Sequence, residues 1–248
     1  MEDRLREIRM IVRSLLLQEN RANSFKMIFL AGAPGSGKST LIEELGLLGF
    51  TNCNIDDFFE PALEAHGLSP NLAQLEEDFL AYRALKKSAE QKGEQLDPED
   101  SREYERLLDL RRTEMSLFAQ SIKKFKALKQ ETCQIGSNFI VDGTGSNYKK
   151  ITKEAEQYRE AGYQVAMIMV DIPTDTAVER NRQRGAKGKR QLSDMVVRRS
   201  AESVLPNEEG YRQYFQPNFW LVPNHGSFEE YKSEIAKIAP ELENFLRG

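Results

Sequence analysis

The chain has few of the residues that build metal centres, disulfide frameworks and membrane spans. It contains two cysteines and two histidines among 248 residues. Cys53 and Cys133 lie far apart and have no metal-ligand spacing, which favours a reducing compartment, and we expect a cytoplasmic protein. His66 and His225 are equally isolated, and we assign neither a role. No apolar run approaches the roughly 20 residues of a membrane-spanning helix, so we expect no membrane partner.

Charge of one sign is also lacking, although charged residues make up 30% of the chain. The formal net charge of −4 argues against a wholly basic nucleic-acid coat, although not against a local basic groove. The chain is long enough for one large α/β domain with an insertion, and no repeat or low-complexity linker divides it. We therefore expect a single domain over residues 1–248.

The first residues predict an amphipathic helix within residues 1–22. Leu5, Ile8, Val12 and Leu15 recur at helical spacing among charged residues, as in a helix that packs on a core. A helix lying on a membrane surface is the alternative, which the acidic residues of this segment disfavour.

A phosphate-binding motif stands between a short apolar run and a predicted helix. Residues 27–31 predict a buried strand, residues 39–48 predict a helix, and residues 32–39 match G-x-x-x-x-G-K-[ST]. Glycines let backbone N–H groups converge on phosphate oxygens, Lys38 can reach the β- and γ-phosphates, and Ser39 can ligate Mg²⁺. We therefore expect a nucleoside triphosphate and Mg²⁺. The nucleotide-binding candidates are Gly32, Ala33, Pro34, Gly35, Ser36, Gly37, Lys38, Ser39 and Thr40.

Two acidic residues follow the second predicted strand. Residues 50–55 predict this strand, and Asp56 and Asp57 come directly after it. Open α/β sheets bind ligands beyond the carboxyl ends of their strands. Phosphoryl transfer also needs a carboxylate near the γ-phosphate. We favour a catalytic role for this pair over an ordinary acidic turn.

Residues 60–134 have a helical composition with almost no β-branched residues. One helix is predicted over residues 71–91, and a second begins with Asp97 as cap and Pro98 at its first position. The second helix runs to about Lys129 and would be about 45 Å long. The pattern predicts a helical hairpin inserted between the second and third strands. It leaves open whether the insertion only packs on the sheet, frames the acceptor site or binds a protein partner.

Three further strands are predicted at residues 137–141, 164–170 and 219–222. Six basic residues and no acidic ones lie between Arg180 and Arg190. We favour an arginine-rich lid over residues 180–192 that closes over the transferring phosphate, rather than a solvated helix face and a flexible loop. The closing helix, over residues 228–245, is expected to break near Pro240.

Four segments in this order resemble P-loop kinases of the zeta-toxin type and, almost as closely, the kinase domain of phage polynucleotide kinase. They are residues 32–39, residues 54–58, residues 141–145, and residues 170–173 with 179–185. The resemblance implies a P-loop NTPase fold with a five-stranded parallel sheet flanked by helices. It also implies ATP with Mg²⁺ as the phosphate donor and a hydroxyl group as the acceptor.

The resemblance also implies roles for single residues. Lys38 stabilises the donor phosphates, and Asp56 accepts the proton of the acceptor hydroxyl. Arg184 and Arg190 match arginines that the two families carry in their lids. Asp57, Asp142 and Thr144 are the candidates for binding the acceptor. Phe59 stands where polynucleotide kinase has an arginine, which weakens the case for a polynucleotide 5′ end.

Two classes of function follow. The leading hypothesis is an ATP-dependent phosphotransferase that moves the γ-phosphate to an alcohol hydroxyl of a nucleotide-sugar, a nucleoside or a nucleic acid. Within it, the alternative is a polynucleotide kinase-like enzyme acting on DNA or RNA hydroxyls. The hypothesis of another class is a nucleotide-dependent switch or assembly ATPase with the helical arm as its output.

Overall fold

The computed structural model describes residues 25–248. The helix expected near the N-terminus falls outside these residues. The described chain divides into two compact units, each assembled from separate stretches of sequence. Among the described residues, unit 1 contains residues 25–54, 127–180 and 197–248, and unit 2 contains residues 55–126 and 181–196.

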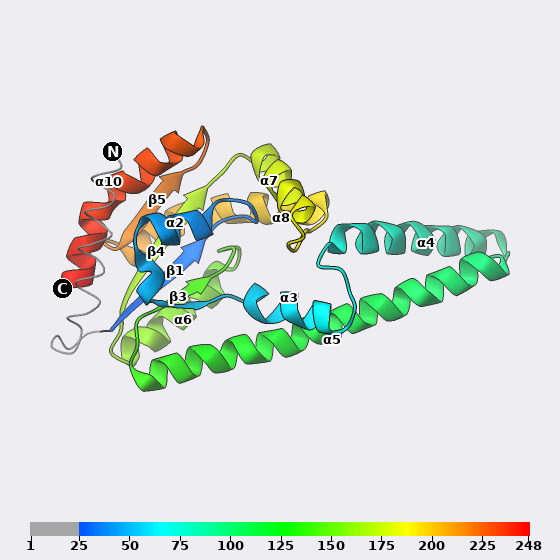
Figure 1. Cartoon of the computed structure of the whole chain (residues 1–248), viewed down its shortest axis with the longest axis horizontal. Helices are drawn as coiled ribbons and strands as arrows, with labels where there is room; N and C mark the ends of the chain where they lie inside the picture. The colour runs from blue at the N-terminus through cyan, green and yellow to red at the C-terminus, as the bar shows by residue number, and fades with distance from the viewer. Residues whose placement is uncertain (1–24) are drawn as a thin grey trace. The chain divides into compact units, whose positions relative to one another are not determined.

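Unit 1 is built on one parallel sheet of five strands in the order β2-β3-β1-β4-β5 (Figure 1). β1 is central: its six residues pair with β4 on one side, four of them pair with β3 on the other, and all six are buried. The sheet confirms the predicted α/β fold class. Its strands are β1 (Lys26–Ala31), β2 (Thr51–Cys53), β3 (Phe139–Asp142), β4 (Gln164–Asp171) and β5 (Phe219–Pro223).

Helices cover both faces of the sheet. On one face, Ile28 and Leu30 of β1 share an apolar core with residues of α2 (Lys38–Glu44) and α10 (Phe228–Arg247). On the other face, Phe29 meets Phe215 of α9 (Glu208–Phe215), and Phe139 meets Tyr158 of α6 (Tyr148–Glu160). The alternation of side chains along β1 thus places one apolar set on each face.

The last helix corrects one expectation. A break near Pro240 was predicted, but α10 continues through this proline to Arg247. Proline removes one backbone donor from a helix. Buried residues on either side of it, Ile238, Ala239 and Leu242, hold the helix against the sheet. Packing therefore outweighs the lost hydrogen bond.

Unit 2 is helical and has a small core of its own. Phe59, Leu63, Leu72 and Leu117 pack together, with Phe118 against them. The predicted pair of long helices is confirmed as α4 (Leu72–Lys92) and α5 (Pro98–Ile135), and α5 enters unit 1 at residue 127. α3 (Asp56–Ala65) was not predicted, because the sequence pattern suggested only a turn there.

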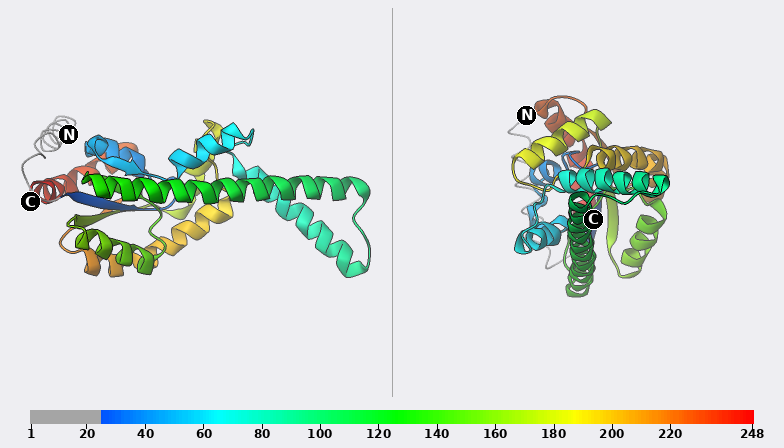
Figure 2. Two further views of the ribbon diagram at one scale, coloured as in Figure 1. Left: turned by 90° about the horizontal axis from the view of Figure 1, so that it is seen from below. Right: turned by 90° about the vertical axis from the view of Figure 1, so that its right-hand side faces the viewer.

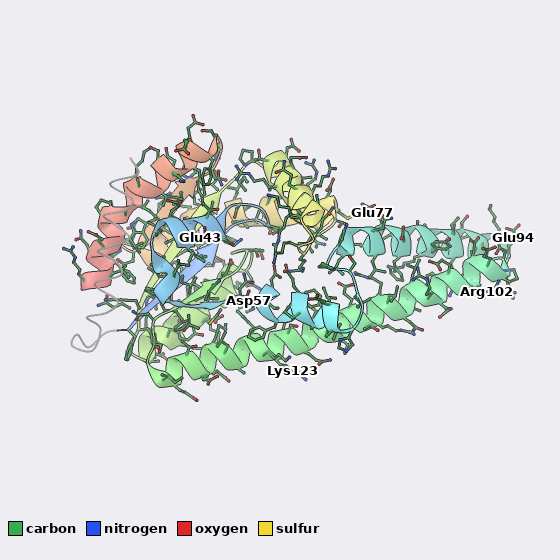
Figure 3. All side chains as sticks on the ribbon, in the orientation of Figure 1. Glu43, Asp57, Glu77, Glu94, Arg102 and Lys123 are labelled. Atoms are coloured by element: carbon green, nitrogen blue, oxygen red, sulfur yellow. The ribbon has the colours of Figure 1, made fainter. Side chains whose placement is uncertain are left out.

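α4 and α5 form a two-helix arm joined near Glu94 (Figures 2 and 3). Its contacts include aromatic and cation–π pairs. The rings of Phe79 and Tyr104 stack with centroids 6.1 Å apart, and the Lys86 ammonium lies 4.7 Å from the Tyr104 ring centroid. Leu85 and Met115 stay exposed on the arm.

Two more helices join the units along the chain. They are α7 (Thr174–Ala186) and α8 (Asp194–Val204). Short 3₁₀ turns occur at Leu47–Gly49 and Leu205–Asn207. No helix within the described residues combines the length and the apolar composition that a bilayer crossing requires.

Candidate functional site

The loop between β1 and α2 has the backbone shape of an anion-binding nest. Gly35 and Gly37 have φ angles of +81° and +97°, which side chains rarely allow. A Cβ atom on Gly37 would also lie 2.8 Å from Nδ2 of Asn224. Glycine is therefore required at this position both by the backbone and by the packing.

Lys38 folds back over this loop. Its Nζ donates to the carbonyl oxygen of Gly32 at 2.9 Å and lies 3.7 Å from Oδ1 of Asp142. The two side chains are 13% and 8% exposed, so this pair is largely shielded from water. Nδ2 of Asn54 donates to the other oxygen of Asp142 at 3.0 Å. Asp142, at the end of β3, thus faces the ammonium group of the nucleotide loop.

The residues of the loop fit a bound phosphate chain. The Ser36 side chain is fully buried, and its hydroxyl has no hydrogen-bond partner. Such an orphaned group fits a site that a ligand completes. Lys38 supplies a positive charge beside it, and Ser39 is exposed on the first turn of α2.

The turn after β3 packs against the first glycine of the loop. The carbonyl oxygen of Thr144 accepts a hydrogen bond from the Gly32 N–H at 3.0 Å. A Cβ on Gly145, whose φ is +81°, would lie 2.6 Å from Cβ of Ala31. The Tyr211 hydroxyl donates to the Gly145 carbonyl at 2.8 Å. These contacts place Thr144 and Asp142 together with the nucleotide loop.

Unit 2 brings the predicted base and both predicted lid arginines into one cluster. Nη1 of Arg190 donates to Oδ1 of Asp56 at 2.5 Å, and Nη2 of Arg184 donates to Oδ2 at 3.2 Å. Glu60 accepts from Nη2 of Arg184 at 2.6 Å and from the backbone N–H of Arg190 at 3.2 Å. We call Asp56, Glu60, Arg184 and Arg190 the arginine–carboxylate cluster.

Aromatic rings and backbone contacts hold the lid end of this cluster. The Arg190 guanidinium carbon lies 5.2 Å from the Phe59 ring centroid and 5.9 Å from that of Phe118. The Asn181 side chain exchanges two hydrogen bonds with the backbone of Leu192, at 2.8 and 3.2 Å. Arginine suits such a position because its flat guanidinium stacks on a ring and still donates from its edge.

Asp57, the neighbour of Asp56 in the first turn of α3, is exposed. Loss of hydration raises the pKa of its carboxyl, and repulsion from Asp56 and Glu60 raises it further. Consecutive residues on a helix point about 100° apart, so only one of the two aspartates can face the arginines. In this structure it is Asp56.

The predicted site residues therefore fall into two groups. Residues 32–40 lie with Asp142 and Thr144 in unit 1, whereas Asp56, Asp57, Arg184 and Arg190 lie in unit 2. Glu60 was missed. It lies one turn after Asp56 on the same face of α3, so a correct helix prediction would have revealed it. Asn54 was noted only as part of a motif, although it holds Asp142.

Comparisons with known proteins place the fold. The AAA domain family AAA_33 matches residues 27–205, and no curated protein matches the chain. A candidate kinase from Chloroflexus aurantiacus J-10-fl shares 16% identity and a TM-score of 0.53, with 90% of this chain and 98% of that chain covered.

Two further solved structures are similar. A chain of the PezAT chromosomal toxin–antitoxin system of Streptococcus pneumoniae has 13% identity and a TM-score of 0.50, with coverages of 99% and 97%. The AvrRxo1-ORF1:AvrRxo1-ORF2 structure with sulphate ions has 15% identity and a TM-score of 0.53, with coverages of 89% and 60%. At these identities the likeness is one of fold, and it agrees with the resemblance drawn from the motifs. The family match spans most of the chain, which therefore belongs to the AAA domain family AAA_33 and has a P-loop kinase-like fold.

Proposed function

We propose that the protein is an ATP-dependent phosphotransferase that moves the γ-phosphate of ATP to an alcohol hydroxyl. The observation that carries the proposal is the arginine–carboxylate cluster: one carboxylate, Asp56, bonded to the guanidinium groups of Arg184 and Arg190. A carboxylate can take the proton of a hydroxyl, and two guanidinium groups can bind the oxygens of a transferring phosphoryl group. In this proposal the nucleotide loop, residues 32–40, binds the phosphate donor.

The donor residues have separate tasks in this proposal. The backbone N–H groups of Gly35 and Gly37 and the Lys38 ammonium bind the phosphate chain and stabilise its negative charge. Mg²⁺ would be held by the Ser39 hydroxyl and would be balanced by Asp142, which already lies beside Lys38. When bound, Mg²⁺ neutralises charge on the phosphate oxygens. No group of three His, Cys, Asp or Glu residues among residues 25–248 is arranged to hold a metal ion by itself, which is compatible with Mg²⁺ because it keeps waters and phosphates as ligands.

The acceptor residues also have separate tasks. Asp56 accepts the proton of the hydroxyl, and Arg184 and Arg190 bind the phosphoryl oxygens through donors in a fixed fork. Glu60 orients Arg184 through their 2.6 Å hydrogen bond. Asp57 and Thr144 remain the candidates for contacts with the acceptor molecule. We take the acceptor to be a nucleotide-sugar, a nucleoside or a nucleic acid.

ADP release measured with and without acceptors tests this proposal. A phosphotransferase turns over ATP much faster when its acceptor is supplied, and Lys38→Ala removes that stimulated rate. A nucleotide-dependent switch would instead hydrolyse ATP slowly at a rate that no small acceptor changes. For that alternative the arm of α4 and α5, with Leu85 and Met115 exposed, offers a surface for a protein partner.

A further inference from the structure

We propose that Asn224 is a positioning residue for the nucleotide loop, and that Tyr231 supports it. Asn224 follows β5, is 1% exposed, and donates through Nδ2 to the Ser36 carbonyl at 2.7 Å. The Tyr231 side chain comes from α10 and donates through its hydroxyl to the Gly37 carbonyl at 3.0 Å. The inference rests on the proposed nucleotide site and names residues that no sequence motif identifies.

The argument begins with the two faces of the nucleotide loop. When successive N–H groups converge on an anion, the carbonyl groups of the same peptides point to the opposite side. A carbonyl that is buried without a donor costs free energy. Asn224 supplies the donor to the Ser36 carbonyl, and Tyr231 adds a second donor to the Gly37 carbonyl, which already accepts from the Leu41 N–H at 3.1 Å. They therefore favour the orientation in which the N–H groups face the phosphate side.

Packing limits the alternatives to this orientation. A Cβ on Gly37 would lie 2.8 Å from Asn224 Nδ2 and 3.0 Å from Cε1 of the Tyr231 ring. The two side chains thus form a close wall behind the loop. Rotation of the Ser36–Gly37 peptide would remove the hydrogen bond to Asn224 and move backbone atoms toward this wall.

A third group fixes the orientation of the Asn224 amide. The side-chain oxygen Oδ1 of Asn224 accepts from Nη2 of Arg180 at 3.2 Å. The backbone N–H of Asn224 donates to the Asp171 carbonyl at 2.7 Å. A guanidinium only donates hydrogen bonds and a carbonyl only accepts them. The amide oxygen must therefore face Arg180, and the amide NH₂ must face Ser36. Arg180 lies on α7, so the amide links the nucleotide loop to that helix.

Asn224→Asp is the sharpest variant. It keeps the side-chain shape and the acceptor toward Arg180, but replaces the donor to the Ser36 carbonyl with a negative oxygen. We expect ADP and ATP to bind about tenfold more weakly or worse, measured by calorimetry. Tyr231→Phe removes one donor only, and the same nucleotides are expected to lose a few-fold in affinity. AMP is expected to change much less, because it lacks the β- and γ-phosphates that the loop would bind.

Tyr214→Phe is the matched control. It removes a hydroxyl that donates at 3.0 Å to the carbonyl of Thr152, in contact with neither the loop nor its wall. Its nucleotide affinity should equal that of the unmodified protein. All variants are compared as folded protein, with thermal unfolding followed in the absence of nucleotide.

The outcomes separate the inference from the proposed function. If Asn224→Asp lowers only the unfolding temperature, and the folded variant binds ADP and ATP normally, Asn224 is merely structural and the inference is wrong. An equal loss for AMP, ADP and ATP also overturns it. If Lys38→Ala itself binds nucleotide normally, the nucleotide site of the proposed function fails. If Lys38→Ala loses nucleotide affinity and Asn224→Asp loses affinity for ADP and ATP but not for AMP, the results support both the inference and the proposed function.

Discussion

Asp56→Asn is the substitution that tests the proposed chemistry most specifically. The amide keeps the size of the side chain but cannot take a proton, so we expect turnover with an acceptor to fall by roughly 10²-fold or more. Nucleotide affinity should be retained, because the proposal assigns nucleotide binding to residues 32–40 and proton transfer to Asp56. Parallel calorimetry with ADP and steady-state ADP release would measure the two quantities separately.

The substitution also has a calculable effect on stability. Asp56 is 17% exposed and is bonded to Arg190, which is 16% exposed, and to Arg184, which is 38% exposed. The bond between Asp56 and Arg190 is the more shielded from water, so it accounts for most of the lost stability, because exposed ion pairs contribute little. We expect unfolding to become easier by about 2 kcal/mol, measured by urea denaturation. Kinetic assays therefore belong at a temperature well below the unfolding midpoint.

Asp109→Asn is the control for removing a charge. Asp109 pairs with Arg112 on the exposed arm, where the side chains are 74% and 66% exposed, so its loss should change neither turnover nor stability measurably. Near-normal turnover in Asp56→Asn would refute the reasoning. If Asp57→Asn were the crippling change and Asp56→Asn the mild one, the assignment of roles on α3 would be wrong by one residue.

Three other predictions follow from the same structure. Lys38→Ala should abolish most nucleotide binding by calorimetry, because its ammonium is the positive charge that lies over the loop, and normal binding would contradict the donor site. Arg184→Lys and Arg190→Lys should lower turnover for any acceptor while donor affinity changes much less, because lysine lacks the forked donors. If these arginines were a nucleic-acid track instead, lysine would be tolerated and activity would fall steeply with salt. Because the pKa of Asp57 is raised, its ionised form disfavours folding, and stability is lost as the pH rises above the ordinary pKa of aspartate. Asp57→Asn should therefore raise the unfolding temperature at neutral pH, by an amount that shrinks as the pH falls to about 4, and a gain that does not depend on pH would contradict this cause.

The parts of the fold that follow from local pattern could be predicted. Apolar runs identified the strands, and the loop residues 32–39 identified the strand-to-helix connection that carries the nucleotide site. The cap at Asp97, whose carboxylate accepts from the N–H groups of Glu99 and Asp100, correctly marked the start of α5. In these places a few neighbouring residues determine the local structure.

The parts that depend on distant contacts could not be predicted. Residues 56–65 begin with two aspartates and contain Pro61, which suggest a turn, yet Phe59 and Leu63 bury against α5 and stabilise a helix. Missing α3 also hid Glu60. Asn224 lies 188 residues from Ser36, and Tyr231 lies 194 residues from Gly37, so no local pattern connects them.

The fate of the γ-phosphate is the most direct measure of the central claim. The protein is incubated with γ-labelled ATP and, separately, with nucleotide-sugars, nucleosides, DNA and RNA, with Lys38→Ala and Asp56→Asn in parallel. The account predicts that the label moves to a hydroxyl of one acceptor class, and that both variants suppress this transfer. Label recovered only as inorganic phosphate, at a rate that no acceptor changes, would contradict it.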